Sequence, residues 1–228
     1  MLKYILFDLD DTIFDFTKAE RVAITEVFEK IGIEPSEKNI ERYCEINREC
    51  WGMLERGEMT REEIVVLRFD RFFSEFNLDF SPKMTQEMYV RALGSHHYFI
   101  EGAENVLSAL SKKYKLYAVT NGLFAVQSPR IRDARLDRFF DGYFISEDIG
   151  FSKPRVEFFD IAFSKTEGFE KEKAIIVGDS LQSDILGGKN AGVRTCYYNP
   201  NNKENKGKII PDYEIKKLSE LPRLLEEI

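Results

Sequence analysis

The sequence predicts an α/β fold in which a doubly wound parallel sheet carries an inserted helical cap domain. After Gly102, short apolar runs alternate with helical patterns, as in parallel sheets whose strands are joined by helices. The segment after the first apolar run carries helical patterns alone. The chain has 228 residues. This is longer than a modal domain of about 100–150 residues and shorter than two full-sized domains. One domain with an insertion fits best.

The predicted core begins with the buried strand at residues 4–7, which is a short run of apolar side chains. Four more strands are predicted at residues 116–120, 143–146, 174–178 and 195–198. Helical patterns around residues 103–110, 155–166 and 184–191 separate several of these strands, which favours parallel pairing through right-handed crossovers. We therefore assign residues 1–14 and 99–228 to a Rossmann-like core.

Residues 15–98 form the predicted cap, because apolar residues recur there at helical spacing with no strand between them. Start signals mark four helices. These signals are the capping pair Thr17 and Glu20, Ser36, the capping pair Thr60 and Glu63, and Ser81-Pro82. Gly32 is predicted to end the first helix.

Composition excludes several classes of protein. With 43% hydrophobic residues, 32% charged residues and a net charge of -7, the chain is typical of a globular protein and unlike one that binds a nucleic-acid backbone. Early charges exclude a signal peptide, and no apolar stretch approaches the roughly 18 residues of a membrane span. We expect a cytoplasmic protein without a membrane partner, while oligomeric state carries no sequence signal. Cys44, Cys50 and Cys196 form no CxxC and are expected to be buried thiols. Residues 199–208 are expected to form a mobile surface loop.

The segment Asp8-Leu9-Asp10 is the first candidate site. It follows the strand at residues 4–7, and ligands of open parallel sheets bind beyond the carboxyl ends of the strands. In an extended segment the two carboxylates point to the same side and repel each other unless a cation lies between them. Magnesium, which binds one or two carboxylates and completes its shell with water and phosphate, fits this pair. The alternative is a surface turn stabilised by Asx hydrogen bonds.

Other predicted strands also end in residues suited to phosphate chemistry. Thr120 and Asn121 offer a hydroxyl and an amide, and Pro154 restricts the reach of Lys153. Asp179 and Asp184 add two carboxylates after the strand at residues 174–178. Each has a simpler explanation by itself, since single lysines are usually solvated and Asp184 could cap a helix.

Taken together, the motifs resemble those of the haloacid dehalogenase superfamily. All four motifs of that family are present in order and span nearly the whole chain. They are Asp8-Leu9-Asp10-Asp11-Thr12, Thr120-Asn121, Lys153-Pro154, and Gly178-Asp179 with Asp184.

The resemblance implies a role for each matching residue. Asp8 would be the nucleophile that forms an aspartyl-phosphate, and Asp10 the general acid and base. Thr120 and Lys153 would hold the oxygens of the transferred group, with help from the turn and side chain of Asn121. The implied cofactor is Mg²⁺, held by Asp8, Asp179 and the Asp10 carbonyl, with Asp184 positioning Lys153 or a water on the metal. Asp11 and Thr12 are expected to make local turn bonds.

Within the superfamily the chain is most similar to the pyrimidine 5'-nucleotidase branch. The similarity lies in residues 8–16, 119–122 with Gln127, 146–154 and 184–192. It implies a magnesium-dependent phosphatase for small phosphorylated metabolites, and for nucleoside 5'-monophosphates in particular. We expect specificity to reside in the cap, although aromatic residues such as Phe16 and Trp51 are expected to be mostly core.

Several alternatives remain open at this level. A sugar-phosphate or phosphoglycolate-type phosphatase and a phosphomutase share the motifs, whereas a metal-free haloacid dehalogenase lacks the second acid that Asp10 supplies. A phosphorylation-dependent receiver lacks a large helical cap after its first strand. A noncatalytic phosphate-binding module would bind ligand without turnover.

Overall fold

A six-stranded parallel sheet forms the centre of the core. The computed structural model describes residues 1–205, 207 and 209–228. The strands lie in the order β3-β2-β1-β4-β5-β6, and every neighbouring pair is parallel. Their bounds are β1 (Tyr4–Phe7), β2 (Lys115–Thr120), β3 (Gly142–Ile145), β4 (Ala174–Gly178), β5 (Arg194–Tyr198) and β6 (Tyr213–Ile215). The doubly wound fold is confirmed, and β6 is a strand that the sequence did not predict.

Helices cover both faces of this sheet because the side chains of each strand alternate between them. In β1, Ile5 and Phe7 pack on one side with α5 (Ala103–Leu110) and α10 (Leu221–Glu227). Tyr4 and Leu6 pack on the other side with α8 (Val156–Ser164) and α9 (Leu186–Ala191). The remaining core helices are α6 (Phe124–Asp133) and α7 (Ser146–Ile149), with short turns η1 (Leu136–Arg138), η2 (Lys171–Lys173), η3 (Leu181–Ile185) and η4 (Leu218–Glu220).

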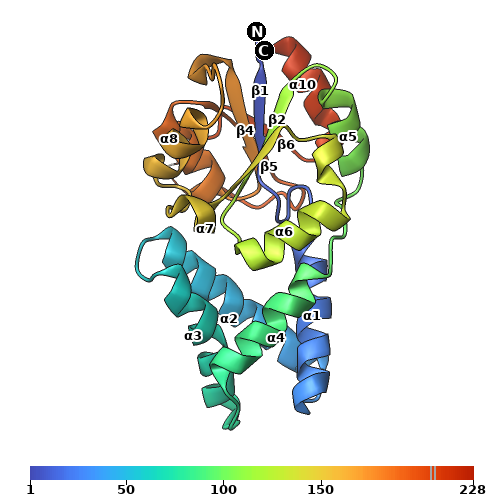
Figure 1. Cartoon of the computed structure of the whole chain (residues 1–228), viewed down its shortest axis with the longest axis vertical. Coiled ribbons are helices and arrows are strands. Elements are labelled where there is room, and N and C mark those ends of the chain that lie inside the picture. Colours follow the sequence, from blue (N-terminus) through green and yellow to red (C-terminus); the bar gives the residue numbers. More distant parts are fainter. Residues whose placement is uncertain (206, 208) are drawn as a thin grey trace.

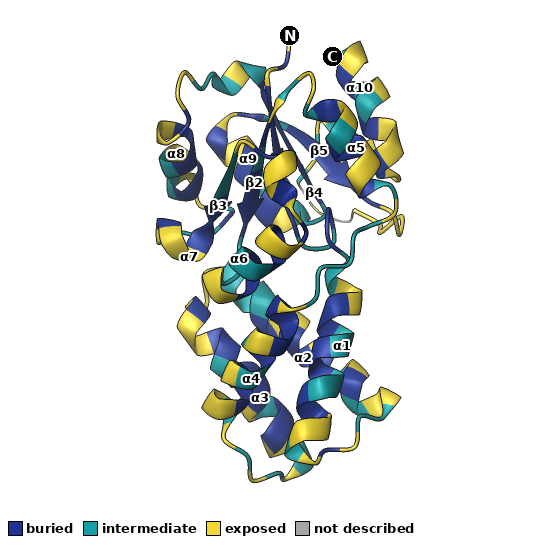
Figure 2. Ribbon diagram, turned by 45° about the vertical axis from the view of Figure 1, so that its right-hand side comes forward, coloured by how far each residue is buried: buried dark blue, intermediate teal, exposed yellow. Residues whose placement is uncertain are grey.

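Four helices form the cap and have a hydrophobic core of their own. They are α1 (Phe16–Ile31), α2 (Glu37–Glu55), α3 (Arg61–Phe76) and α4 (Pro82–Gly94). Their buried faces turn toward one another and their exposed faces turn outward (Figure 2). Figure 1 shows the cap beyond the carboxyl end of β1, while both chain ends lie at the opposite end of the core. The division at residues 14/15 and 98/99 stays a prediction.

Three of the four predicted start signals in the cap are confirmed. Ser36 and Ser81 cap α2 and α4, and Thr60 forms a full capping box with Glu63 at the start of α3. The predicted pair Thr17 and Glu20 is wrong as a capping box. Asp15 caps α1 instead, because its carboxylate accepts a hydrogen bond from the Lys18 backbone N–H.

Thr17 is engaged elsewhere. Its backbone N–H and its hydroxyl both donate to the carboxylate of Asp11, at 3.0 and 3.2 Å. Asp11 adopts a positive φ of 56° in the loop after β1, so the expected local role of Asp11 includes anchoring the start of α1 to this loop.

Three further expectations concern the cysteines, membrane-spanning helices and the loop at residues 199–208. The three cysteines are buried free thiols, as predicted. None of the helices in the described ranges is long and apolar enough to cross a membrane. In the predicted loop at residues 199–208, Lys206 and Lys208 lie outside the described residues, and the others form no helix or strand.

Candidate active site

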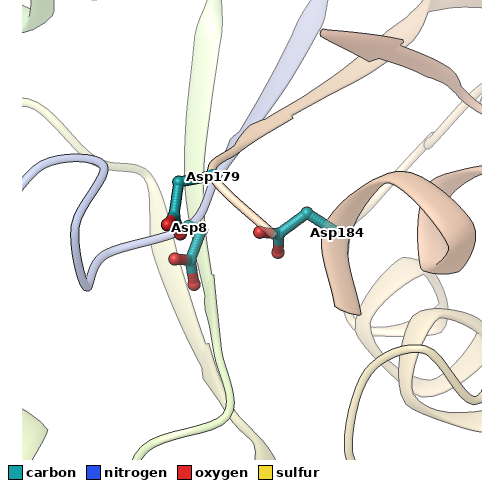
Figure 3. Close-up of side chains that lie close together, drawn as sticks. All are labelled: Asp8, Asp179 and Asp184. Carbon is teal, nitrogen blue, oxygen red and sulfur yellow. The ribbon is translucent and has the colours of Figure 1, made fainter. Parts of the chain in front are cut away.

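Three carboxylates from separate segments converge at the edge of the sheet that faces the cap. Asp8 follows β1 and Asp179 follows β4, and these strands are direct neighbours. Asp184 comes from η3, a π-helical turn. One carboxylate oxygen of each residue lies within 4.8 Å of the other two. Figure 3 shows Asp184 turned toward Asp8 and Asp179 from across this space.

The close approach of Asp184 depends on the glycine at the end of β4. A Cβ on Gly178 would collide with the Asp184 carboxylate. Any side chain at Gly178 would therefore force Asp184 away from its position beside Asp8.

Burial makes this cluster unfavourable unless a positive charge joins it. Burial, reinforced by Asp184, raises the pKa of Asp179 to about 8. Burial also raises the pKa of Asp8 well above its ordinary value, although the neighbouring Lys153 opposes this. A divalent cation would remove the penalty, and carboxylate oxygens are the ligands that magnesium prefers. The donor set of Asp8 and Asp179 fits Mg²⁺.

Lys153 provides a buried positive charge within the cluster, and Lys203 places a more exposed one 3.9 Å from Asp179 Oδ2. The Lys153 Nζ atom donates to Asp8 Oδ1 at 2.7 Å, Asp184 Oδ1 at 2.6 Å and the Val119 carbonyl at 2.8 Å. Lys153 is buried. Burial acts to lower the pKa of its ammonium, but Asp184 and Asp8 together outweigh this effect and keep the pKa above its ordinary value. Lys153 is thus a fixed cation with all three donors in use.

Asn121 fixes the backbone of Lys153. Its side-chain oxygen accepts from the Lys153 N–H at 2.8 Å, and its side-chain nitrogen donates to the Lys153 carbonyl at 3.0 Å. Both ends of the amide are therefore directed at Lys153. Sequence reasoning anticipated a contribution from the Asn121 side chain, and the geometry makes that contribution one of positioning.

Thr120 has a hydroxyl whose oxygen is already an acceptor. It accepts from the Gln127 side-chain nitrogen at 2.9 Å and from the Gly122 N–H at 3.1 Å. The hydroxyl hydrogen of Thr120 is used in neither bond, so it remains able to donate to an anion.

The carboxylate of Asp10 is turned toward α6. Arg130 Nη1 donates to Asp10 Oδ1 at 2.6 Å, and Gln127 Nε2 donates to Asp10 Oδ2 at 2.7 Å. Asp10 thus lines the same cavity as Asp8, but its carboxylate is not in the three-carboxylate cluster. The predicted main-chain contact of Asp10 with the metal stays a prediction.

The cavity itself lies between core and cap and has a volume of about 170 Å³. The cap contributes Phe16, Trp51 and Glu55 to its wall. Ser180 Oγ donates to Glu55 Oε1 at 3.1 Å, which joins the cap to the loop after β4. A ligand on Asp8 would therefore contact cap side chains.

The structure brings the predicted site residues together and adds others. Asp8, Asp10, Thr120, Asn121, Lys153 and Asp179 all line this cavity, and Asp184 lies behind it in contact with Lys153. The expectation that most aromatics are core holds for Phe14 and Tyr89, and it is wrong for the exposed Phe124. Phe16 and Trp51 pack against the cap core and also line the cavity.

Sequence reasoning missed Glu55, Arg130 and any structural role for Gln127. Gln127 and Arg130 are spaced i and i+3, which places them on one face of a helix. That spacing was the available signal, but it did not identify their partners, which lie far away in the sequence.

Comparison with known proteins identifies the family of this chain. The family model for haloacid dehalogenase-like hydrolases matches residues 5–198. The chain is 42% identical over 97% of its length to the HAD-hydrolase YfnB of Bacillus subtilis, covering 94% of that protein. It is 35% identical over 99% of its length to the pyrimidine 5'-nucleotidase PynA of Streptococcus pneumoniae, covering 95% of that protein. The crystal structure of magnesium-bound YfnB superposes with a TM-score of 0.94 at 41% identity, covering 98% of each chain.

Proposed function

The chain belongs to the haloacid dehalogenase-like hydrolase family, and we propose that it is a magnesium-dependent phosphatase that hydrolyses nucleoside 5'-monophosphates through an aspartyl-phosphate. One observation carries this proposal: the buried Asp8 and Lys153 meet beside Asp179 in a cavity between core and cap. A nucleophile, a cation site and a fixed ammonium at one point are what phosphoryl transfer requires.

In the proposed reaction Asp8 is the nucleophile. One of its carboxylate oxygens bonds to phosphorus while the bond from phosphorus to the ester oxygen breaks. Water then attacks phosphorus, and the bond to Asp8 breaks to release inorganic phosphate and restore the carboxylate. This route divides one difficult displacement into two easier ones.

Asp10 handles the protons in both steps. It gives a proton to the departing alkoxide and later accepts one from the attacking water. Its hydrogen bonds to Arg130 and Gln127 hold the carboxylate at the cavity wall and away from the metal cluster, and they favour the ionised form that accepts a proton from water.

Thr120 and Lys153 bind the oxygens of the transferred group in this proposal. Thr120 is suited to this because its hydroxyl hydrogen is not used in its bonds to Gln127 and Gly122. Lys153 is suited because Asn121 and Asp184 hold both its backbone and its ammonium.

Asp8, Asp179 and the Asp10 carbonyl would hold Mg²⁺, and Asp184 would position Lys153. When bound, the ion offsets the repulsion between the Asp8 carboxylate and the phosphate and stabilises the charge that develops during transfer.

The choice of a nucleoside monophosphate rests on the whole-length similarity to PynA, a protein named as a pyrimidine 5'-nucleotidase. The cap side of the cavity suits a small organic leaving group, because Phe16 and Trp51 place aromatic surface beside the position proposed for the phosphate. The cytoplasmic location stays a prediction from the sequence.

The test is a phosphate-release assay on pyrimidine and purine 5'-monophosphates, glucose 6-phosphate and p-nitrophenyl phosphate, with Mg²⁺ and with EDTA. We expect Mg²⁺-dependent turnover that favours nucleotides. Asp8→Asn should lose at least about 10³-fold in rate while keeping the wild-type circular dichroism spectrum, because no other group forms the covalent intermediate. Asp70→Asn, at an exposed position of the cap, is the matched control.

Three results would overturn parts of the proposal. Unchanged turnover in Asp8→Asn would refute the nucleophile assignment. Full activity in EDTA would refute the metal requirement, and turnover of sugar phosphates without nucleotides would refute the substrate class.

A further inference from the structure

A second cavity adjoins the catalytic one on the side of the cap. It has a volume of about 180 Å³ and lies between α1, α2 and the loop after β1, which contributes Asp11. Phe16 and Trp51 line both cavities, so the two spaces are adjacent at these residues. Each cavity alone is smaller than a typical small-molecule site of about 300–1,000 Å³, and the two combined fall within that range.

Buried polar side chains form part of the wall of this second cavity, which is also lined by Asp11, Thr17, Cys44 and Arg48. Glu20 and Asn47 line it, with only 6% and 2% of their surface exposed. Asn47 Nδ2 donates to Glu20 Oε1 at 2.5 Å. Burying a carboxyl group costs free energy, so its place at a cavity wall within the cap calls for an explanation.

Arg68 fixes the orientation of this pair. The buried Arg68 donates to Asn47 Oδ1 at 2.7 Å and to Gln86 Oε1 at 2.6 Å. Because the Asn47 oxygen is taken by Arg68, its nitrogen must face Glu20. The hydrogen bond from Asn47 therefore holds the Glu20 carboxyl in one orientation.

Resting on the proposed function, we propose that this second cavity receives the base of a pyrimidine nucleoside monophosphate, which contacts Phe16 and Trp51 and is recognised at its polar edge by Glu20. Asn47 acts as the positioning residue for Glu20.

The spacing of these residues favours a single-ring base. Glu20 lies four residues after Phe16 on α1, and Trp51 lies four residues after Asn47 on α2. At about 1.5 Å per residue, this four-residue spacing separates the aromatic pair from the polar pair by about 6 Å along each helix. A six-membered ring with its exocyclic groups spans this distance, and a fused two-ring purine exceeds it.

The chemistry of Glu20 matches the edge of either pyrimidine. Uracil presents an N–H donor beside carbonyl acceptors, and cytosine presents an amino donor beside a ring nitrogen that accepts. A carboxyl group offers an acceptor when ionised, and an acceptor beside a donor when protonated. Burial raises the pKa of Glu20 to about 7, so both forms are available near neutral pH.

The test compares nucleotide turnover with turnover of a substrate that has no base. For wild type, Glu20→Met and Glu20→Gln, kcat/KM is measured on UMP, CMP, AMP and p-nitrophenyl phosphate with Mg²⁺. We expect Glu20→Met to lower the ratio of UMP to p-nitrophenyl phosphate at least ten-fold, because the hydrogen bond to the base is lost. Glu29→Met, at an exposed position of the same helix, should keep the wild-type ratio.

The two proposals fail in different ways. Wild-type turnover of p-nitrophenyl phosphate without nucleotide turnover would refute the proposed nucleotidase function. Good nucleotide turnover whose ratio to p-nitrophenyl phosphate is the same in wild type and Glu20→Met would refute the base subsite alone. If Glu20→Met does not fold, Glu20→Gln decides: a change of at least three-fold in the UMP to CMP ratio supports the subsite, and an unchanged ratio overturns it.

Discussion

The guanidinium of Arg130 lies 2.6 Å from the carboxylate of Asp10, although the two residues are 120 positions apart in the sequence. Arg130 is completely buried, and its Nε atom donates to the His96 carbonyl at 2.8 Å. His96 lies just after α4, where the chain returns from the cap to the core. One side chain thus connects the proposed general acid with the segment that joins cap and core.

Replacing Arg130 should impair catalysis, because Arg130 holds the carboxylate of the proposed general acid Asp10. Arg130 Nη1 also donates to Gln127 Oε1 at 2.9 Å. Arg130→Lys keeps the charge but cannot maintain the bonds to Asp10, Gln127 and His96 together. We expect kcat for phosphate release to fall at least ten-fold, since positioned acid–base catalysis contributes about 10²–10⁴-fold. The matched control is Arg132→Lys, whose exposed side chain pairs with Asp133. Equal rates in the two variants would contradict this role.

The Asn121 amide should matter for both stability and activity. Asn121→Ala leaves the N–H and carbonyl of the buried Lys153 without partners, at a cost of about 1–3 kcal/mol. We expect a lower urea midpoint and a loss of activity, because Lys153 is no longer fixed. Asn190→Ala is the control, as Asn190 donates one exposed hydrogen bond to the neighbouring Pro154 carbonyl. Similar losses in both variants would argue against a specific clamp on Lys153.

Magnesium should stabilise the folded protein measurably. A ligand that binds only the folded state at 100 times its Kd adds about 2.7 kcal/mol, and each kcal/mol raises Tm by about 2–4 °C in a chain of this size. We therefore expect differential scanning fluorimetry to show a rise of several degrees that EDTA reverses. Asp179→Asn should remove the rise, whereas the exposed Asp160→Asn should keep it. A wild-type Tm that does not respond to Mg²⁺ would refute the cation site.

Glu20 should make the stability of the protein depend on pH. Burial raises its pKa from 4.5 to about 7 in the folded state, so the folded state keeps a proton that the unfolded state loses as pH rises between these values. Stability from Glu20 therefore falls with rising pH. At about 1.4 kcal/mol for each pH unit the upper limit is about 3 kcal/mol.

This effect can be isolated by comparing urea unfolding of wild type and Glu20→Gln at pH 5 and pH 8. We expect wild type to lose about 2 kcal/mol relative to the variant over this interval. Glu29→Gln, at an exposed position, should show no such change. A constant difference between wild type and Glu20→Gln would mean that Glu20 titrates at its ordinary pKa.

The sequence predicts most of the sheet because the inner strands are buried on both faces. All four residues of β1 and all five of β4 are buried, and such strands appear as continuous apolar runs. The three-residue strand β6 lies at an edge, and its central Glu214 is exposed, so it has no comparable pattern. The helix α6 was missed because Pro129 lies inside it and proline usually signals a helix end.

The candidate site likewise contains residues that the sequence predicts and contacts that it does not. Asp8, Thr120, Lys153 and Asp179 were predictable because each follows a recognisable strand or precedes a proline. The bonds of Arg130 to Asp10 and of Glu55 to Ser180 join distant segments, and side-chain partners at such separations leave no local pattern. Thr17 was misassigned because the competing partner of its hydroxyl, Asp11, lies outside the helix.

The full occupation of the Lys153 ammonium has a consequence for the order of events in the proposed reaction. Its three hydrogens point to Asp8, Asp184 and the Val119 carbonyl, so an arriving phosphate oxygen gains a bond from Lys153 only by displacing one of these acceptors. Asp8 is the acceptor that weakens, because its charge passes into the new bond with phosphorus. One N–H of the Lys153 ammonium can then donate to a phosphate oxygen in place of Asp8 while the intermediate exists. It donates to Asp8 again when the carboxylate is restored.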